Sequence, residues 1–189
     1  MFFVINNFGA SINVKKIRKY FREQENTRIN ENTIARYIQI LENAKIITRC
    51  SRFDMKSRKS LTGEQKYYLA DLSLYFAQNT DNRINYGPVL ENIMFNYAKS
   101  RNYAVSVGRI GNLECDFIFR DNTMNYAYAQ VAYTILASRE TEDREYRPLE
   151  KIPDNYPKFV FTMDYLIQKR NGIRHENIME FIKGNRRFE

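Results

Sequence analysis

Residues 111–132 read GNLECDFIFRDNTMNYAYAQVA, and this stretch decides the fold class. It holds two runs rich in aromatic and aliphatic residues, Leu113–Arg120 and Asn125–Thr134, with the turn residues Asp121-Asn122 between them. Short runs of this composition, separated by a turn, are typical of neighbouring β-strands. The stretch therefore predicts two adjacent strands of a sheet.

The pattern on both sides of these strands alternates between helices and strands. Before them, Pro88–Arg101 has apolar residues at helical spacing, and Ala104–Arg109 reads as a strand. After them come a charged helix at Ser138–Leu149, a short strand at Lys158–Thr162 and a last helix at His175–Lys183. We therefore expect a mixed α/β fold whose second half has the order helix, three strands, helix, strand.

Three polar residues in these elements carry the argument about a site: Glu91 in the helix, Asp116 in one strand and Gln130 in the next. Strand alternation places Asp116 on one face of its strand together with Glu114 and Ile118. If the two strands pair, Asp116 and Gln130 converge, and Glu91 reaches them from the helix. The sequence therefore predicts a cluster of two carboxylates and one amide.

This order of an acid on a helix, an acid on a strand and a polar residue on the next strand resembles the metal site of PD-(D/E)XK nucleases. That site needs carboxylates to hold Mg²⁺ and a lysine, supplied by a Glu-x-Lys motif, to steady the developing charge. Here the third segment reads Gln130-Val131-Ala132, so the lysine and one acid are missing. We expect no active catalytic residue, with Glu91, Asp116 and Gln130 as remnants of a site.

Two alternatives stay open. In the first, a nonstandard nuclease binds Mg²⁺ through Glu91 and Asp116 and recruits a lysine such as Lys99 or Lys158. Unless this alternative holds, we expect no cofactor. A purely structural interpretation makes Glu91 a residue favoured by the helix dipole, Asp116 part of a solvated strand face and Gln130 a buried amide.

Positive charge is concentrated in the first half of the chain. Residues 1–80 hold 14 Lys and Arg against 7 Asp and Glu, whereas residues 81–189 hold 16 against 15. Helical patterns at Val14–Gln24 and Glu31–Ala44 precede two extended segments that flank a polar, basic loop at 54–65. This order predicts a winged-helix domain at 1–80, followed by a nuclease-like domain at 81–189.

A winged helix binds DNA through its second helix and its hairpin, and basic side chains contact the phosphates. The nucleic-acid-binding residues expected on this basis are Arg36 and Gln39 from the helix, and Arg49, Arg52, Lys56, Arg58 and Lys59 from the hairpin. An excess of charge that serves only solubility is the plain alternative.

Composition excludes several functions. One histidine and two distant cysteines, Cys50 and Cys115, argue against a zinc site and favour a reducing cytoplasm. No apolar run is long enough to span a membrane, and no GxxxxGK[ST] loop offers an ATP site. His175 precedes a predicted helix, so we expect a surface or capping role for it.

Taken in order, several stretches of the sequence resemble the C-terminal region of prokaryotic AAA-type P-loop ATPases, a domain of unknown function. The resemblance runs from Val4 to Lys183, and the stretches that carry it are Asn32–Tyr37, Leu41-Glu42, Lys66–Asp71, Leu90–Ile93, Val107-Gly108, Glu114–Phe117, Gln130–Ala132, Glu140–Glu142, Arg144-Glu145 and Asp154–Lys158. The resemblance implies a winged-helix segment, a nuclease-like domain and an ATPase module upstream, which is absent here.

Three functions remain open at this point. The first is a DNA-binding module on a degenerate nuclease scaffold. The second is a module that contacts an ATPase portion or another protein. The third is a metal-dependent nuclease with a nonstandard site.

Overall fold

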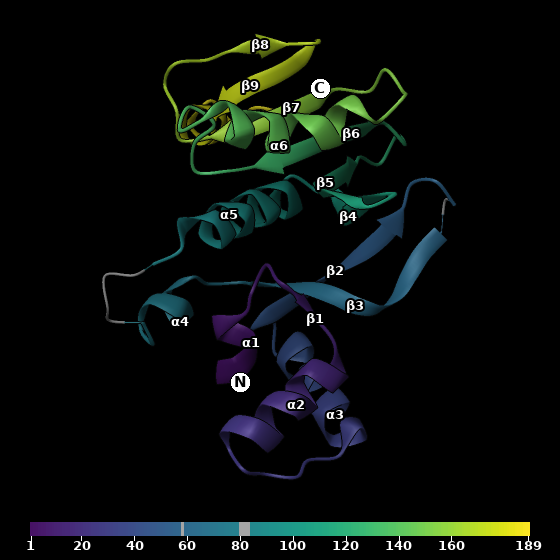
Figure 1. Ribbon diagram of the computed structural model, residues 1–189, viewed down its shortest axis with the longest axis vertical. Helices are drawn as coiled ribbons and strands as arrows, with labels where there is room; N and C mark the ends of the chain where they lie inside the picture. Colours follow the sequence, from purple (N-terminus) through teal and green to yellow (C-terminus); the bar gives the residue numbers. More distant parts are fainter. Residues whose placement is uncertain (58, 80–83) are drawn as a thin grey trace.

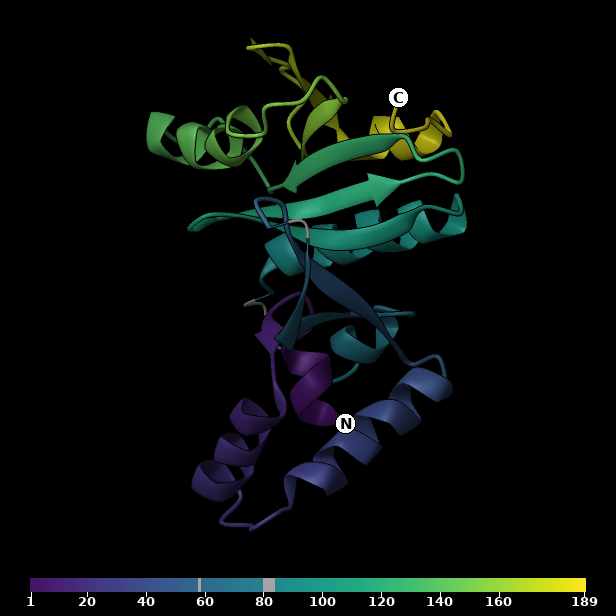
Figure 2. The same ribbon diagram turned by 90° about the vertical axis from the view of Figure 1, so that its right-hand side faces the viewer.

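The computed structural model describes residues 1–57, 59–79 and 84–189, and Figures 1 and 2 show it from two directions. The first half begins with helices and ends with a long hairpin. Its elements are α1 (Phe2–Asn6), β1 (Ser11–Ile12), α2 (Val14–Gln24), α3 (Glu31–Asn43), β2 (Ile47–Asp54), β3 (Lys59–Leu69) and α4 (Ser73–Phe76).

The second half alternates helices and strands, as its sequence pattern predicts. Its elements are α5 (Tyr86–Ser100), β4 (Ala104–Ile110), β5 (Leu113–Arg120), β6 (Tyr126–Val131), α6 (Arg139–Glu150), β7 (Lys158–Thr162), β8 (Lys169–Arg170), β9 (Ile173–Asn177) and α7 (Ile178–Lys183). The chain is therefore a mixed α/β protein.

The strands of the described residues form one mixed sheet in the order β1-β3-β2-β4-β5-β6-β7-β9-β8. The two halves of the chain join where β2 pairs with β4 in parallel, from Ser51 opposite Ser106 to Asp54 opposite Arg109. The expected domain boundary after residue 80 lies outside the described residues, and the division into two domains stays a prediction. Independently of that division, the hairpin β2–β3 is hydrogen-bonded through β2 to β4 of the second half.

Helices cover both faces of this sheet. On one face α5 and α7 pack on Phe117, Phe119, Phe159 and neighbouring residues, and on the other face α6 covers Cys115 and its neighbours. A third apolar cluster lies between α1, α2, α3 and the strands of the first half. Figure 1 shows α2 and α3 at one end of the molecule and β8 and β9 at the other.

Helix starts follow from local capping. The side chains of Asn13, Asn30, Asn85, Ser138 and Asn177 each accept a hydrogen bond from a backbone N–H in the first turn of the helix that follows. The predicted helices at 14–24 and 31–44 are confirmed to within one residue. No helix within the described ranges is long and apolar enough to cross a lipid bilayer.

Three local predictions are wrong. The helix expected from His175 begins at Ile178, because residues 173–177 form β9 beside β7. His175 is therefore buried, at 2% exposure, and its Nε2 lies 2.7 Å from the Thr162 hydroxyl instead of at the surface. The basic loop expected at 54–65 is shorter, because β3 already begins at Lys59.

A fourth correction concerns the faces of β5. The register with β4 shifts between the pairs Ser106–Ile118 and Gly108–Cys115, which marks a bulge. Cys115 and Ile118 consequently share the cluster under α6, while Phe117 points into the opposite cluster. Simple alternation had placed Ile118 on the opposite face from Cys115.

Candidate functional site

The three polar positions singled out in the sequence lie close together in the fold. Glu91 comes from α5, Asp116 from β5 and Gln130 from β6. Backbone pairing of β5 with β6 begins at Phe117 opposite Ala129. Beyond it, side chains continue the contact: the Asp116 N–H donates to Gln130 Oε1 at 2.7 Å, and the Val131 N–H donates to Asp116 Oδ2 at 2.9 Å.

A lysine from the first half of the chain enters this site. Lys66 on β3 has a side chain only 7% exposed, and its Nζ lies 3.2 Å from Glu91 Oε2 and 3.0 Å from Glu114 Oε1. The same nitrogen is 4.0 Å from Asp116 Oδ1. One ammonium group therefore contacts three carboxylates that arise from a helix and a strand of the second half.

Burial and charge act against each other in this cluster. Burial alone would lower the pKa of Lys66, but the neighbouring Glu91, Asp116 and Glu114 raise it above its ordinary value, so the ammonium stays charged. Burial raises the pKa of Glu91, although Lys66 and the Tyr68 hydroxyl, 2.9 Å away, oppose the shift. Burial and the nearby Glu91 raise the pKa of Asp116 well above its ordinary value.

Gln130 connects this cluster with α6. While its Oε1 accepts from Asp116, its Nε2 lies 3.3 Å from Glu145 Oε2, so both ends of the buried amide have partners. Glu145 is also buried, at 6% exposure, and its other oxygen accepts from the guanidinium of Arg144 at 3.0 Å. The amide therefore links the backbone of β5 at Asp116 to the carboxylate of Glu145 on α6.

Arg52 makes a second ionic connection between the two halves. Its guanidinium lies 2.7 Å from Glu114 Oε2 and 3.6 Å from Glu64 Oε2, and its side chain is 17% exposed. Since Lys66 binds the other oxygen of Glu114, two cations of the hairpin share this carboxylate. The hairpin is thereby anchored beside the cluster.

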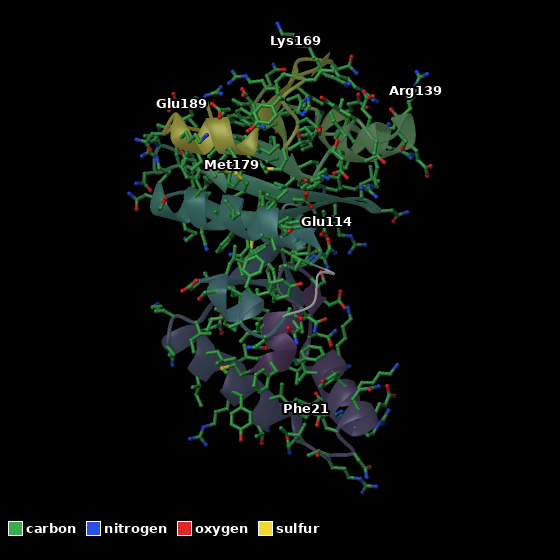
Figure 3. All side chains as sticks on the ribbon, turned by 90° about the vertical axis from the view of Figure 1, so that its left-hand side faces the viewer. Phe21, Glu114, Arg139, Lys169, Met179 and Glu189 are labelled. Atoms are coloured by element: carbon green, nitrogen blue, oxygen red, sulfur yellow. The ribbon has the colours of Figure 1, made fainter. Side chains whose placement is uncertain are left out.

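The cluster lies at the bottom of an open cleft of about 610 Å³. Its walls come from the start of α5, from the turn before β5 and the first residues of β5, from the segment after β6, and from α6. The lining includes Glu91, Glu114, Asp116, Gln130, Arg144 and Glu145. Figure 3 shows Glu114 between the helices of the first half and the layer that carries Arg139.

The site is a cluster of carboxylates whose negative charge is compensated by the ammonium group of Lys66. Within the part of the chain that the structure describes, no three His, Cys, Asp or Glu side chains gather around a point suited to a metal ion. Glu91, Asp116 and Glu114 instead surround the Lys66 ammonium. These carboxylates are the side chains that would have to exchange Lys66 for Mg²⁺ if a metal entered.

The lysines considered from the sequence lie elsewhere. Lys158 donates to the backbone carbonyls of Ile152 and Asp154, and Lys99 lies exposed in the last turn of α5. Sequence reasoning missed Lys66 because β3 was assigned to another module. The available signal was its place at the head of the segment Lys66–Asp71, one of the stretches that carry the resemblance.

Among the described residues, the predicted nucleic-acid contacts divide into exposed side chains and side chains held in ion pairs. Arg36 and Gln39 are exposed on α3, and Lys56 and Lys59 are exposed at the hairpin tip. Arg49 lies 2.7 Å from Glu42, and Arg52 is bound to Glu114. Arg58 lies outside the described residues. The exposed residues of α3 and of the hairpin tip are thus the ones available to a ligand.

Comparisons with known proteins give two similarities and no function. A family model described as a domain of unknown function (DUF8612) matches residues 3–85. An uncharacterized protein of Haemophilus influenzae (strain ATCC 51907 / DSM 11121 / KW20 / Rd) is 31% identical over 166 residues, which cover 88% of this chain and 40% of the relative. The chain thus spans less than half of that relative's length. No solved structure matches the chain. The comparisons connect the chain with a domain of unknown function and a distant relative, and with neither ATPases nor nucleases.

Proposed function

We propose that this chain is a nucleic-acid-binding module on a nuclease-like scaffold whose site is neutralised from within. The observation that carries the scaffold half of the proposal is Lys66, whose ammonium contacts Glu91 and Glu114 and lies 4.0 Å from Asp116. An ammonium held in this way occupies the space between the carboxylates that a divalent cation would need.

The order of elements supports both parts of the proposed architecture. In the first half, β1 pairs with β3 and the helices α2 and α3 precede the hairpin, as expected of a winged helix. In the second half, α5, three antiparallel strands, α6 and the parallel strand β7 follow the order of the nuclease-like core.

The exposed face of α3 supports the proposed contact with nucleic acid. Arg36 and Gln39 face solvent, and Tyr37 and Ile40 beside them are 55% and 51% exposed. Arginine and glutamine are side chains that contact phosphates and base edges. The net charge of +8, most of it in residues 1–80, favours an anionic partner.

Fluorescence anisotropy with a labelled duplex tests this function. We expect Arg36→Ala combined with Gln39→Ala to weaken binding at low salt, because both side chains lie on the proposed contact face. The matched control is Lys99→Ala combined with Gln24→Ala, which removes one charge and one amide elsewhere. Equal losses of affinity in both double variants would show that the loss arises from a nonspecific change of charge. No binding by the unchanged protein would leave protein interaction as the better account.

A metal-dependent nuclease is the second candidate; in it Lys66 would serve as the catalytic lysine, beside a metal ion that displaces the ammonium from between the carboxylates. The lysine missing at Ala132 has a spatial substitute in Lys66, whose Nζ lies 3.2 Å from Glu91 and 4.0 Å from Asp116. Cleavage of DNA that needs Mg²⁺ or Mn²⁺ and disappears in both Asp116→Asn and Lys66→Arg would establish this alternative. The partnership with an ATPase module is a separate proposal, which the resemblance alone supports.

A further inference from the structure

Two tyrosines stand at the mouth of the cleft without being part of any core. Tyr86 is the first residue of α5, and Tyr133 follows the end of β6. Tyr86 is 51% exposed and Tyr133 is 56% exposed. Their ring centroids are 5.9 Å apart, at an interplanar angle of 37°. Tyr133 lines the cleft, as do both chain neighbours of Tyr86.

The exposed pair contributes little to the core. Aromatic rings stabilise a fold when they are buried, and Tyr86 and Tyr133 leave about half of their surface in water. The Tyr133 backbone is held independently, because its carbonyl accepts from the Met163 N–H at 3.0 Å. Its ring is therefore available to a ligand without being needed to hold the segment.

Arginines continue the same surface along α6. A second hollow of about 810 Å³ shares Leu113, Thr141 and Arg144 with the cleft. Its remaining lining consists of Arg139, Arg147, Glu140 and Asp143, and Asp143 is paired with Arg170. Figure 3 shows Arg139 projecting outward at the end of the layer above Glu114. Cationic side chains thus adjoin an aromatic pair across one continuous concave surface.

We propose that this surface binds an unpaired nucleotide strand, with one base stacked on the Tyr86–Tyr133 pair and the neighbouring phosphates on Arg144 and Arg147. This inference rests on the proposed nucleic-acid function and names the form of ligand at the cleft. A base can stack on a tyrosine only when its face is free, and a paired base inside a duplex does not offer its face. The required ligand is therefore single-stranded, or an unpaired end.

The acids of the cleft do not prevent such a strand from approaching. Lys66 and Arg52 bind Glu114, and Lys66 binds Glu91. Arg144 contacts Glu145, but its side chain is 73% exposed, so it can face a phosphate at the same time. The carboxylate groups are largely paired with cations at the bottom of the cleft, whereas the tyrosines stand at its mouth. The strand would therefore follow the arginines of α6 and place only a base toward the cleft.

The test uses a single-stranded oligonucleotide that contains 2-aminopurine, a fluorescent base that is quenched by stacking. We expect Tyr133→Ala to weaken its binding by about 5- to 150-fold, the range that corresponds to loss of one stacked base, and to relieve the quenching. Tyr133→Phe keeps the ring, so its affinity should stay within about 2-fold of the unchanged protein. Tyr165→Ala is the matched control, since Tyr165 is 79% exposed and does not line the cleft.

Salt dependence tests the arginines separately. Arg144→Gln combined with Arg147→Gln should flatten the slope of log affinity against log salt by about 1.4, because each phosphate contact on a single strand contributes about 0.7. Lys99→Gln combined with Lys183→Gln serves as the control and should leave the slope unchanged.

The outcomes separate this inference from the proposed function. If the Arg36/Gln39 double variant loses duplex binding while Tyr133→Ala binds the single strand like Tyr165→Ala, the tyrosine platform is refuted and the function survives. If the unchanged protein binds neither form of DNA, both are refuted. Selective loss of single-strand binding and quenching in Tyr133→Ala supports the platform.

Discussion

Replacing Lys66 with methionine removes the cation around which the carboxylate cluster is organised. The side chain is 7% exposed and its Nζ is 3.0 Å and 3.2 Å from two carboxylates. Breaking a buried ion pair by deleting one partner costs about 3–5 kcal/mol, because the remaining charge stays buried without compensation. We expect Lys66→Met to lower the free energy of unfolding by an amount in this range at pH 8.

The loss should depend on pH with a defined sign. Burial already raises the pKa of Glu91 and Asp116, and removal of the ammonium raises both pKa values further. Between the pKa values that these two carboxyl groups have in the unfolded chain and the higher values in the folded variant, the folded variant binds more protons than the unfolded chain. The stability of the variant therefore falls as the pH rises through this interval. The difference from the unchanged protein should therefore be small at pH 5 and largest at pH 8.

Urea unfolding followed by circular dichroism at pH 5, 6, 7 and 8 measures this difference. Lys59→Met, an exposed position on the same strand, controls for loss of a lysine in β3. Adding Glu91→Gln to Lys66→Met removes one uncompensated charge and should restore about 1–3 kcal/mol, and it also provides a folded protein if the single variant does not fold. A loss below about 1 kcal/mol, or one of equal size at pH 5 and pH 8, would refute the assignment of Lys66 as the partner of these carboxylates.

Three further predictions concern separate parts of the molecule. Burial lowers the pKa of His175 despite the opposing charge of Asp164, so stability should fall as pH drops from the ordinary value of 6.5 through the lowered pKa, and this dependence should vanish from the unfolding curves of His175→Gln. No Mg²⁺- or Mn²⁺-dependent cleavage of single- or double-stranded DNA is expected in a gel assay, and cleavage that is lost in Asp116→Asn would contradict it. Lys56→Ala combined with Lys59→Ala should flatten the salt slope of duplex binding by about 2 units, whereas an unchanged slope would remove the hairpin tip from the contact surface.

Local regularities explain which elements could be predicted. The apolar periodicity of Val14–Gln24 and the runs Leu113–Arg120 and Lys158–Thr162 reappear with the same bounds in α2, β5 and β7. Helical and strand periods depend on neighbouring residues, so they can be read in a short window. The approach of Glu91, Asp116 and Gln130 was also predicted, since it requires only that a helix and two successive strands be adjacent.

Other features depend on pairing between distant segments. The segment Ile173–Asn177 is a strand because β7 offers it an edge, although its own sequence was taken for the start of a helix. The bulge in β5 depends on its register with β4, and it places Cys115 and Ile118 on the same face, which simple alternation does not. A register is set by contacts across the sheet, which no local window contains.

By itself, the sequence determined the mixed α/β class, most of the helices and strands, and the elements from which the acids of the cleft arise. Only the tertiary structure decided that β2 joins β4 and that Lys66 of the first half stands among Glu91, Glu114 and Asp116. The physical reason is that a buried charge is retained only where opposite charges surround it. Such surroundings are assembled by strands and helices that lie far apart in the chain.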